Sequence, residues 1–151
     1  MGRFATGIAI VTTRHDGLQH AMTVNALTSV SLDPVLVLFC AERVARFHDA
    51  VLASGDWAVS VLGEDARDVS QWLAKRGRPL DGQLDGIAHH PGRHTGAAIL
   101  DDAIGALECR THAVYDGGDH AIVVGRVLDV GVPRAEGGPL LFYQGEYREL
   151  R

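Results

Sequence analysis

The sequence has very little lysine and only two cysteines, and these shortages exclude several classes of protein. Lys75 is the only lysine among 14 basic residues, against 19 acidic ones, so the formal net charge is −5. Such a chain has no basic stripe of the kind that binds DNA or RNA. Cys40 and Cys109 stand in separate apolar segments, and their spacing matches neither a zinc motif nor a disulfide framework. We expect two buried thiols.

Long apolar runs are also missing. The longest extends from Val35 to Ala41, far short of the roughly 20 residues that a membrane-spanning helix needs. Residues 1–7 lack the charged-then-apolar order of a secretory signal, so we expect a cytoplasmic protein that contacts no membrane. The 151 residues, 46% hydrophobic and 22% charged, have the length and composition of one globular domain, and we take 1–151 as that domain.

Familiar catalytic motifs are absent as well. The chain contains no catalytic triad, phosphate-binding Walker loop, GxGxxG or paired metal-ligand spacing, so simple hydrolase functions lose their support. His89, His90 and His94 stand close together, but no nearby cysteine or carboxylate completes a zinc set. We therefore expect these histidines to lie in a solvated loop and predict no metal site.

The periodicity of the chain predicts more strands than helices. Extended segments at 7–13, 19–25, 35–41, 57–62, 107–115, 121–132 and 139–150 are separated by turn residues such as Asp16-Gly17. Helical spacing occurs only in 43–54, which Gly55 closes, and in a segment that carries Ala66, Val69, Trp72 and Leu73 and ends near Gly77. Because strands and helices do not alternate, an antiparallel barrel is favoured over a doubly wound sheet. Residues 77–96 have neither period, which fits a functional lid or an ordered surface loop.

Two short polar regions are candidates for chemistry. Residues 23–31 hold the only asparagine, Asn25, and four hydroxyl side chains, which together with backbone amides can hold a phosphate or the edge of a heterocycle. The same pattern fits an edge strand whose alternate residues face water, and by itself favours that interpretation. His120 follows Gly117-Gly118-Asp119 and is either accessible to a ligand at a loop tip or merely exposed beside a tight turn.

In order and spacing, several blocks together resemble the flavin reductase-like family, and the resemblance covers nearly the whole chain. The blocks are residues 3–13, 22–34, 37–40, 57–62, 107–109, 118–120 and 125–127. This resemblance implies a mainly β fold with a few helices, an antiparallel Greek-key split β-barrel that binds FMN. It also implies a homodimer that transfers hydride from NADH or NADPH to FMN or FAD and supplies the reduced flavin to a partner monooxygenase.

The resemblance also assigns residues to the site. It implies that His120 lies near the nicotinamide as the catalytic residue, while the segment after Met22 meets the flavin ring and phosphate and the end of the apolar strand lies along the ring. The cofactor-binding residues so implied are Thr23, Val24, Asn25, Ala26, Thr28, Ser29, Val30, Ser31, Cys40, Ala41, Arg46, Gly118 and Asp119.

One departure from the family pattern concerns the flavin phosphate. Relatives often carry small hydroxyl residues where this chain has Ala45 and Phe47, and we expect Arg46 to compensate. Two alternatives stay open: a flavin-retaining oxidoreductase that acts directly on an organic substrate, and a flavin or haem carrier without enzyme activity. The sequence does not distinguish FMN from FAD or NADH from NADPH.

Overall fold

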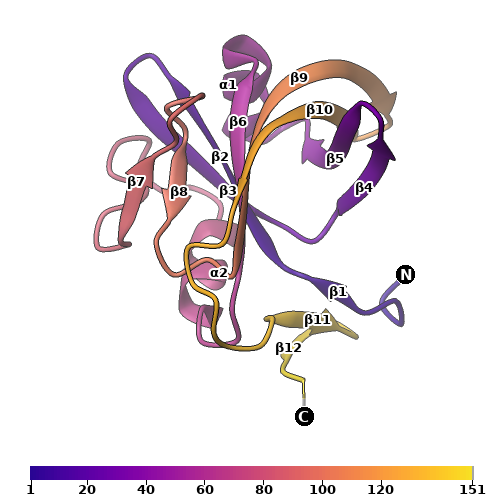
Figure 1. Ribbon diagram of the computed structural model, residues 1–151, viewed down its shortest axis with the longest axis vertical. Helices are drawn as coiled ribbons and strands as arrows, with labels where there is room; N and C mark the ends of the chain where they lie inside the picture. Colours follow the sequence, from indigo (N-terminus) through magenta and orange to yellow (C-terminus); the bar gives the residue numbers. More distant parts are fainter. Residues whose placement is uncertain (151) are drawn as a thin grey trace.

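Seven strands pair into one antiparallel sheet, which is the main feature of the computed structural model (Figure 1). The structure describes residues 1–150, and the strand order in the sheet is β3-β2-β6-β9-β10-β5-β4. Every neighbouring pair is antiparallel, which confirms the mainly β, antiparallel prediction. The strands are β2 (Ala9–His15), β3 (Leu18–Val24), β4 (Leu27–Leu32), β5 (Val35–Glu42), β6 (Asp56–Val61), β9 (Gly105–Gly117) and β10 (His120–Gly131).

Two smaller sheets accompany the main one. The short strand β1 (Thr6–Gly7) pairs with the C-terminal hairpin of β11 (Leu141–Tyr143) and β12 (Glu146–Arg148). Figure 1 shows this group beside the N-terminus, below the β4–β5 hairpin. The hairpin of β7 (His89–Pro91) and β8 (Ala98–Leu100) is separate. The prediction that residues 77–96 contain no regular structure is therefore wrong for β7.

The two predicted helices are present, but both differ from the predicted bounds. The first, α1 (Arg46–Ser54), ends as predicted at Gly55, whose left-handed backbone (φ 73°) lets its N–H donate to Val51 O. It begins three residues later than expected, because the backbone N–H of Arg43 donates to Asp119 O (2.9 Å) and stays at the end of β5. The second, α2 (Arg67–Ala74), ends before Gly77 because Lys75 is already extended (ψ 135°).

The central strands are buried on both faces, which explains their uninterrupted apolar runs. Along β2, Val11 faces a core around Trp57 and Phe39, while Ile10 faces a second core that contains Leu73 of α2. A strand that is buried on both sides does not alternate between apolar and polar residues. The prediction of two buried thiols holds for Cys109, whereas Cys40 is only half-buried. No helix among residues 1–150 is long and apolar enough to cross a bilayer.

Candidate functional site

One cavity of about 480 Å³, here called the basic cavity, lies between the end of β3, the start of α1 and the segment after α2. Asn25 and Ala26 form one wall, Cys40 and Glu42 of β5 form another, and His120 lies at its margin. Five further basic side chains line it, from β3, α1 and the chain after α2: His20, Arg46, Lys75, Arg76 and Arg78. Glu42 is the only acidic residue in its lining.

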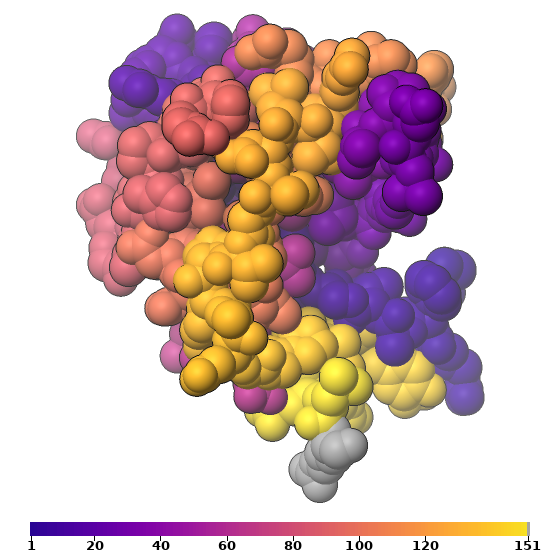
Figure 2. All heavy atoms as spheres, viewed as in Figure 1, coloured from indigo at the N-terminus to yellow at the C-terminus, as the bar shows by residue number. Residues whose placement is uncertain are grey.

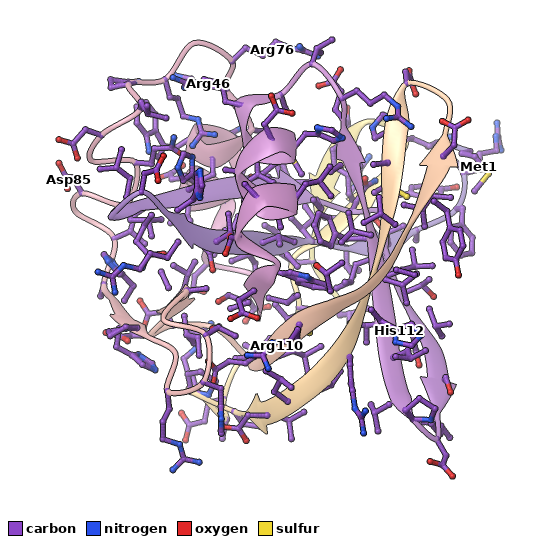
Figure 3. All side chains as sticks on the ribbon, turned by 90° about the horizontal axis from the view of Figure 1, so that it is seen from above. Met1, Arg46, Arg76, Asp85, Arg110 and His112 are labelled. Carbon is purple, nitrogen blue, oxygen red and sulfur yellow. The ribbon has the colours of Figure 1, made fainter. Side chains whose placement is uncertain are left out.

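Two of these guanidinium groups keep an uncompensated positive charge. Arg76 donates to Glu42 (2.7 Å), but neither Arg46 nor Arg78 forms an ion pair with a carboxylate among residues 1–150. Arg78 is partly buried, and burial together with the nearby Arg46 charge lowers its pKa. Figure 3 shows Arg46 and Arg76 along one edge of the molecule. The cavity therefore favours an anionic ligand, since an anion would relieve the repulsion between like charges.

The first turn of α1 adds to this positive region. Ala45 is the N-cap residue and makes no side-chain hydrogen bond to the helix, so the side-chain acceptor that usually satisfies a first-turn N–H is missing. Val44, Ala45, Arg46 and Phe47 all line the basic cavity. Unsatisfied N–H groups at a helix N-terminus attract phosphate oxygens, and here they adjoin the Arg46 guanidinium.

A second cavity of about 810 Å³, here called the apolar cavity, adjoins the first. It lies between the N-terminal residues, β4 and the turn of the C-terminal hairpin, and Ile8, Ala9, Leu27 and Leu38 are among its apolar lining residues. In Figure 2 this region is a hollow between the purple β4–β5 atoms and the indigo N-terminus. The two cavities share the residues Val24, Asn25, Ala26 and Cys40, so one elongated ligand can contact both.

The turn between β9 and β10 holds His120 at the margin of the basic cavity. The turn consists of Gly118 and Asp119, shorter than the predicted 116–120 loop. Arg43 fixes it to the end of β5: Nε donates to Gly118 O (2.8 Å) and Nη2 to Asp116 Oδ1 (2.6 Å), and this contact lowers the pKa of Asp116. Within the turn, His120 Nδ1 lies 2.7 Å from Asp119 Oδ1, which fixes the orientation of the imidazole.

His20 is the second histidine of the basic cavity, and sequence reasoning did not identify it. Its side chain is buried in β3, and Nδ1 has no hydrogen-bond partner among the described residues. Burial lowers its pKa, and the nearby His15 and Arg46 charges lower it further. A neutral imidazole is therefore favoured beside the Arg46 and Arg78 charges.

The chain is similar over its whole length to a known family of proteins. The model of the flavin reductase like domain matches residues 1–151. The chain belongs to the flavin reductase-like family. A relative from Mycobacterium tuberculosis, the reductase subunit HsaB of a flavin-dependent monooxygenase, is 38% identical over 97% of this chain and 77% of its own length. The reductase component of a 4-hydroxyphenylacetate 3-monooxygenase from Thermus thermophilus is 39% identical over 99% of this chain and 92% of its own length.

Solved structures of flavin reductases have the same fold. BorF, the flavin reductase component of a bacterial two-component tryptophan halogenase, superposes with a TM-score of 0.93 at 41% identity, over 99% of this chain and 92% of that chain. The NADH:FAD oxidoreductase SgcE6 from Streptomyces globisporus, solved with NAD and FAD fragments, gives a TM-score of 0.92 at 34% identity, over 99% of this chain and 88% of that chain.

The structure brings about half of the family-implied residues to the cavities. The basic cavity is lined by Thr23, Val24, Asn25, Ala26, Cys40, Arg46 and His120, and the apolar cavity also by Thr28. Outside both linings are Ser29, Val30 and Ser31 on β4, the fully buried Ala41, and Gly118 and Asp119 in the β9–β10 turn. The cation-rich segment Lys75 to Arg78 was missed, although it is the densest basic stretch in this reductase-like sequence.

Proposed function

We propose that this chain is an NADH-dependent flavin reductase that supplies reduced flavin to a partner oxygenase. The observation that carries the proposal is the pair of adjoining cavities, one basic and one apolar, with Val24–Ala26 and Cys40 as their common wall. A flavin nucleotide has the same two parts, an anionic phosphate and a flat aromatic ring. Relatives over nearly the full chain bear names such as NADH-dependent FMN reductase and NADH-dependent flavin reductase.

The residues present fit the phosphate end of a flavin nucleotide. Arg46 and Arg78 lack carboxylate partners within residues 1–150, and the uncapped turn at Ala45 offers backbone N–H groups. Arg46 thus offers the phosphate a charged donor in place of the hydroxyl donors that are missing at positions 45 and 47. Arg78 is anchored for this role, since its Nη2 donates to Ala21 O (3.0 Å) and its Nε to Lys75 O (2.9 Å).

The ring end would lie along Asn25, Ala26 and Cys40, because small side chains let a flat ring approach the backbone closely. Thr28, Ser29, Val30 and Ser31 belong to β4, which borders the apolar cavity. Thr28 lies in its lining, and a contribution of the other three to flavin binding stays a prediction. The same holds for Ala41, Gly118 and Asp119, which support the β5 end and the turn that carries His120.

His120 is proposed to position the nicotinamide. When both nucleotides are bound, the chemistry is transfer of a hydride from the nicotinamide to the flavin, which requires the reacting atoms to lie about 3–3.5 Å apart. The protein therefore has to orient two rings and to exclude water, and it needs no strong acid. The Asp119 contact orients the His120 imidazole, and Arg43 in turn holds the backbone of the turn.

Three finer features complete the proposal. The seven-stranded sheet curls into the split barrel of this family, with the β4–β5 hairpin on one side of the opening. Two copies of the chain associate, and the cytoplasm is the compartment where NADH and the partner oxygenase are available. The exposed apolar side chains of β4 and β5, Val30, Leu32 and Val35, support the association.

A steady-state assay tests the proposed activity. NADH or NADPH is mixed with FMN, FAD or riboflavin, and nucleotide oxidation is followed by absorbance. We expect NADH to be oxidised only when enzyme and flavin are both present, with a lower KM for FMN or FAD than for riboflavin, which lacks the phosphate. Nucleotide oxidation no faster than the enzyme-free blank with every flavin would refute the function.

A further inference from the structure

We propose that His94, Glu108 and Asp129 form a binding site for a divalent metal ion of the zinc class. Each of these side chains offers one ligand atom, and the three atoms lie within 4.8 Å of one another. Glu108 and Asp129 also line a third cavity, of about 330 Å³, whose lining shares no residue with the basic or the apolar cavity. The proposal therefore concerns a second site, independent of flavin reduction.

Glu108 is the most buried of the three proposed ligands. It is only 3% exposed and forms no ion pair among the described residues. One carboxylate oxygen, Oε1, accepts three hydrogen bonds, from the backbone N–H groups of His94 and Thr95 and from the Thr95 hydroxyl (2.8–3.0 Å). The other oxygen, Oε2, accepts none within residues 1–150. Glu108 lines the third cavity, and Oε2 is not one of the fully buried atoms without a partner, so a cation in that cavity could reach a free oxygen of an otherwise buried carboxylate.

The strand register places a second carboxylate against the first. Asp129 on β10 is the direct cross-strand partner of Glu108 on β9. A register shift between Val127 and Asp129 produces this pairing, since an unshifted ladder would continue from the Val127–Cys109 pair with Leu128 opposite Glu108. Like charges directly opposite each other on paired strands are destabilising. The extra residue therefore creates a charge conflict that a bound cation would remove.

The neighbouring side chains His94 and Arg93 do not neutralise the Glu108 carboxylate. His94 Nε2 lies 3.8 Å and Arg93 Nη2 3.9 Å from Asp129 Oδ2, both beyond hydrogen-bond distance. Neither forms an ion pair with Glu108. The three side chains thus surround a gap instead of bonding to one another, and Zn²⁺ needs ligand atoms at about 2.0–2.2 Å from the ion. His94 is exposed and Asp129 half-buried. Asp129 Oδ1 accepts a hydrogen bond from the Val130 backbone N–H (3.0 Å), which leaves Oδ2, the oxygen nearer His94, for the ion.

The donor set determines the kind of ion. One imidazole nitrogen and two carboxylate oxygens suit Zn²⁺ and similar transition metals, whereas Mg²⁺ and Ca²⁺ prefer oxygen ligands alone. The ligands come from the β7–β8 turn, β9 and β10, so the ion would fasten that turn to two strands of the main sheet. Three protein ligands leave a fourth position for water from the adjoining cavity.

Zinc titration of the chelator-treated, dialysed protein tests the site. We expect isothermal titration with ZnCl₂ to show about one ion bound per chain, and the thermal unfolding midpoint to rise with ZnCl₂ because the ion binds only the folded chain. Asp129→Asn and His94→Ala should each weaken Zn²⁺ binding by at least about tenfold and abolish most of the midpoint rise. Asp129→Asn keeps the size of the side chain, so it addresses the ligand without disturbing the fold.

His90→Ala is the matched control. His90 lines the same cavity but pairs with Asp101 (2.6 Å) and is not part of the ligand group, so the variant should bind Zn²⁺ like the parent protein. The proposal fails if the parent takes up no stoichiometric Zn²⁺, which would mean that His94 and Arg93 alone balance the carboxylates. It also fails if both ligand variants bind with parental affinity, or if only His90→Ala loses binding, which would indicate adventitious surface binding.

Discussion

At the scale of single residues, the orientation of His120 is fixed by Asp119 and by the Arg43 clamp on the turn. His120→Ala removes the imidazole but leaves the turn, because the clamp contacts the Gly118 carbonyl and Asp116. We expect a higher KM for NADH or slower hydride transfer, with flavin affinity nearly unchanged, since in the proposed arrangement the two nucleotides contact different parts of the site. Stopped-flow reduction of bound flavin measures this. If the variant reduced bound flavin as fast as the parent protein at every NADH concentration, His120 would have no role in positioning the nicotinamide.

Arg46 and the flavin phosphate allow a comparison between ligands. Arg46→Gln removes a charge-assisted contact of about 1.5–3 kcal/mol, so the Kd for FMN should rise by roughly 10- to 100-fold. Riboflavin, which lacks the phosphate, should bind the variant and the parent alike. Fluorescence titration measures both ligands, with Arg110→Gln as the control, because Arg110 pairs with Asp56 on the outer surface. Equal losses for FMN and riboflavin would show that Arg46 does not contact the phosphate.

His20 should make stability fall in mild acid. Burial lowers its pKa in the folded protein below 6.5, the value of an unperturbed histidine. On acidification His20 therefore takes up a proton in the unfolded chain before it does so in the folded protein. The free energy of unfolding that neutral His20 contributes is fully present above about pH 6.5 and decreases as the pH falls below that value. His20→Gln should flatten this decrease in urea unfolding between neutral and mildly acidic pH. The exposed His112→Gln is the control, and an unchanged pH slope in His20→Gln contradicts the assignment.

At the scale of elements, β10 depends on a glycine in its middle. A Cβ at Gly125 would lie 2.2 Å from the ring of Trp57, which is fully buried, packs edge-on against Phe39 and donates from Nε1 to Thr111 Oγ1. Gly125→Ala should therefore lower the free energy of unfolding by about 1–3 kcal/mol or more through overpacking. Gly131→Ala, on the same strand with open space at its Cβ, should change it little. Urea denaturation measures the free energy of unfolding of both variants. Equal values would contradict tight packing at Gly125.

Some features of the strands and helices could be predicted from the sequence alone, and others could not. Strands, hairpins and Gly55 as the end of α1 were predictable because they depend on local periodicity and backbone preferences. The exact start of α1 was not, because the Arg43–Asp119 hydrogen bond joins residues far apart in the chain. The register shift before Asp129 has no local signature either. For the same reason the histidine cluster at 89–94 gave no metal prediction: Glu108 and Asp129 reach His94 only through the fold.

For the site, the family resemblance identified the Thr23–Ala26 wall, Arg46 and His120, all of which line the basic cavity. It did not identify Arg78 or His20, which line the same cavity. Arg78 reaches the cavity because the chain after α2 folds back onto β3, where Arg78 donates to Ala21 O. His20 is one of several strand residues by sequence, and only burial beside Arg46 gives it a lowered pKa.

At the scale of the whole molecule, an exposed apolar edge predicts a homodimer. Within residues 1–150, β4 is the last strand of the main sheet and pairs only with β5. The β4–β5 hairpin exposes Val30, Leu32 and Val35, with Leu32 85% exposed. An unpaired apolar edge next to an open cavity is a typical contact for a second copy. Light scattering should therefore give about twice the 16.2 kDa mass of one chain.

A charged side chain on β4 tests whether this edge forms the dimer contact. Leu32→Glu would place two like charges near each other across a two-fold contact, where burying an unpaired carboxylate is costly. We expect its dimer to dissociate at protein concentrations where the parent stays dimeric, while Leu52→Glu, on the exposed side of α1, stays dimeric. Light scattering over a dilution series measures both variants. A parent mass near 16.2 kDa at all concentrations rejects the dimer, and a stable Leu32→Glu dimer moves the contact to another face.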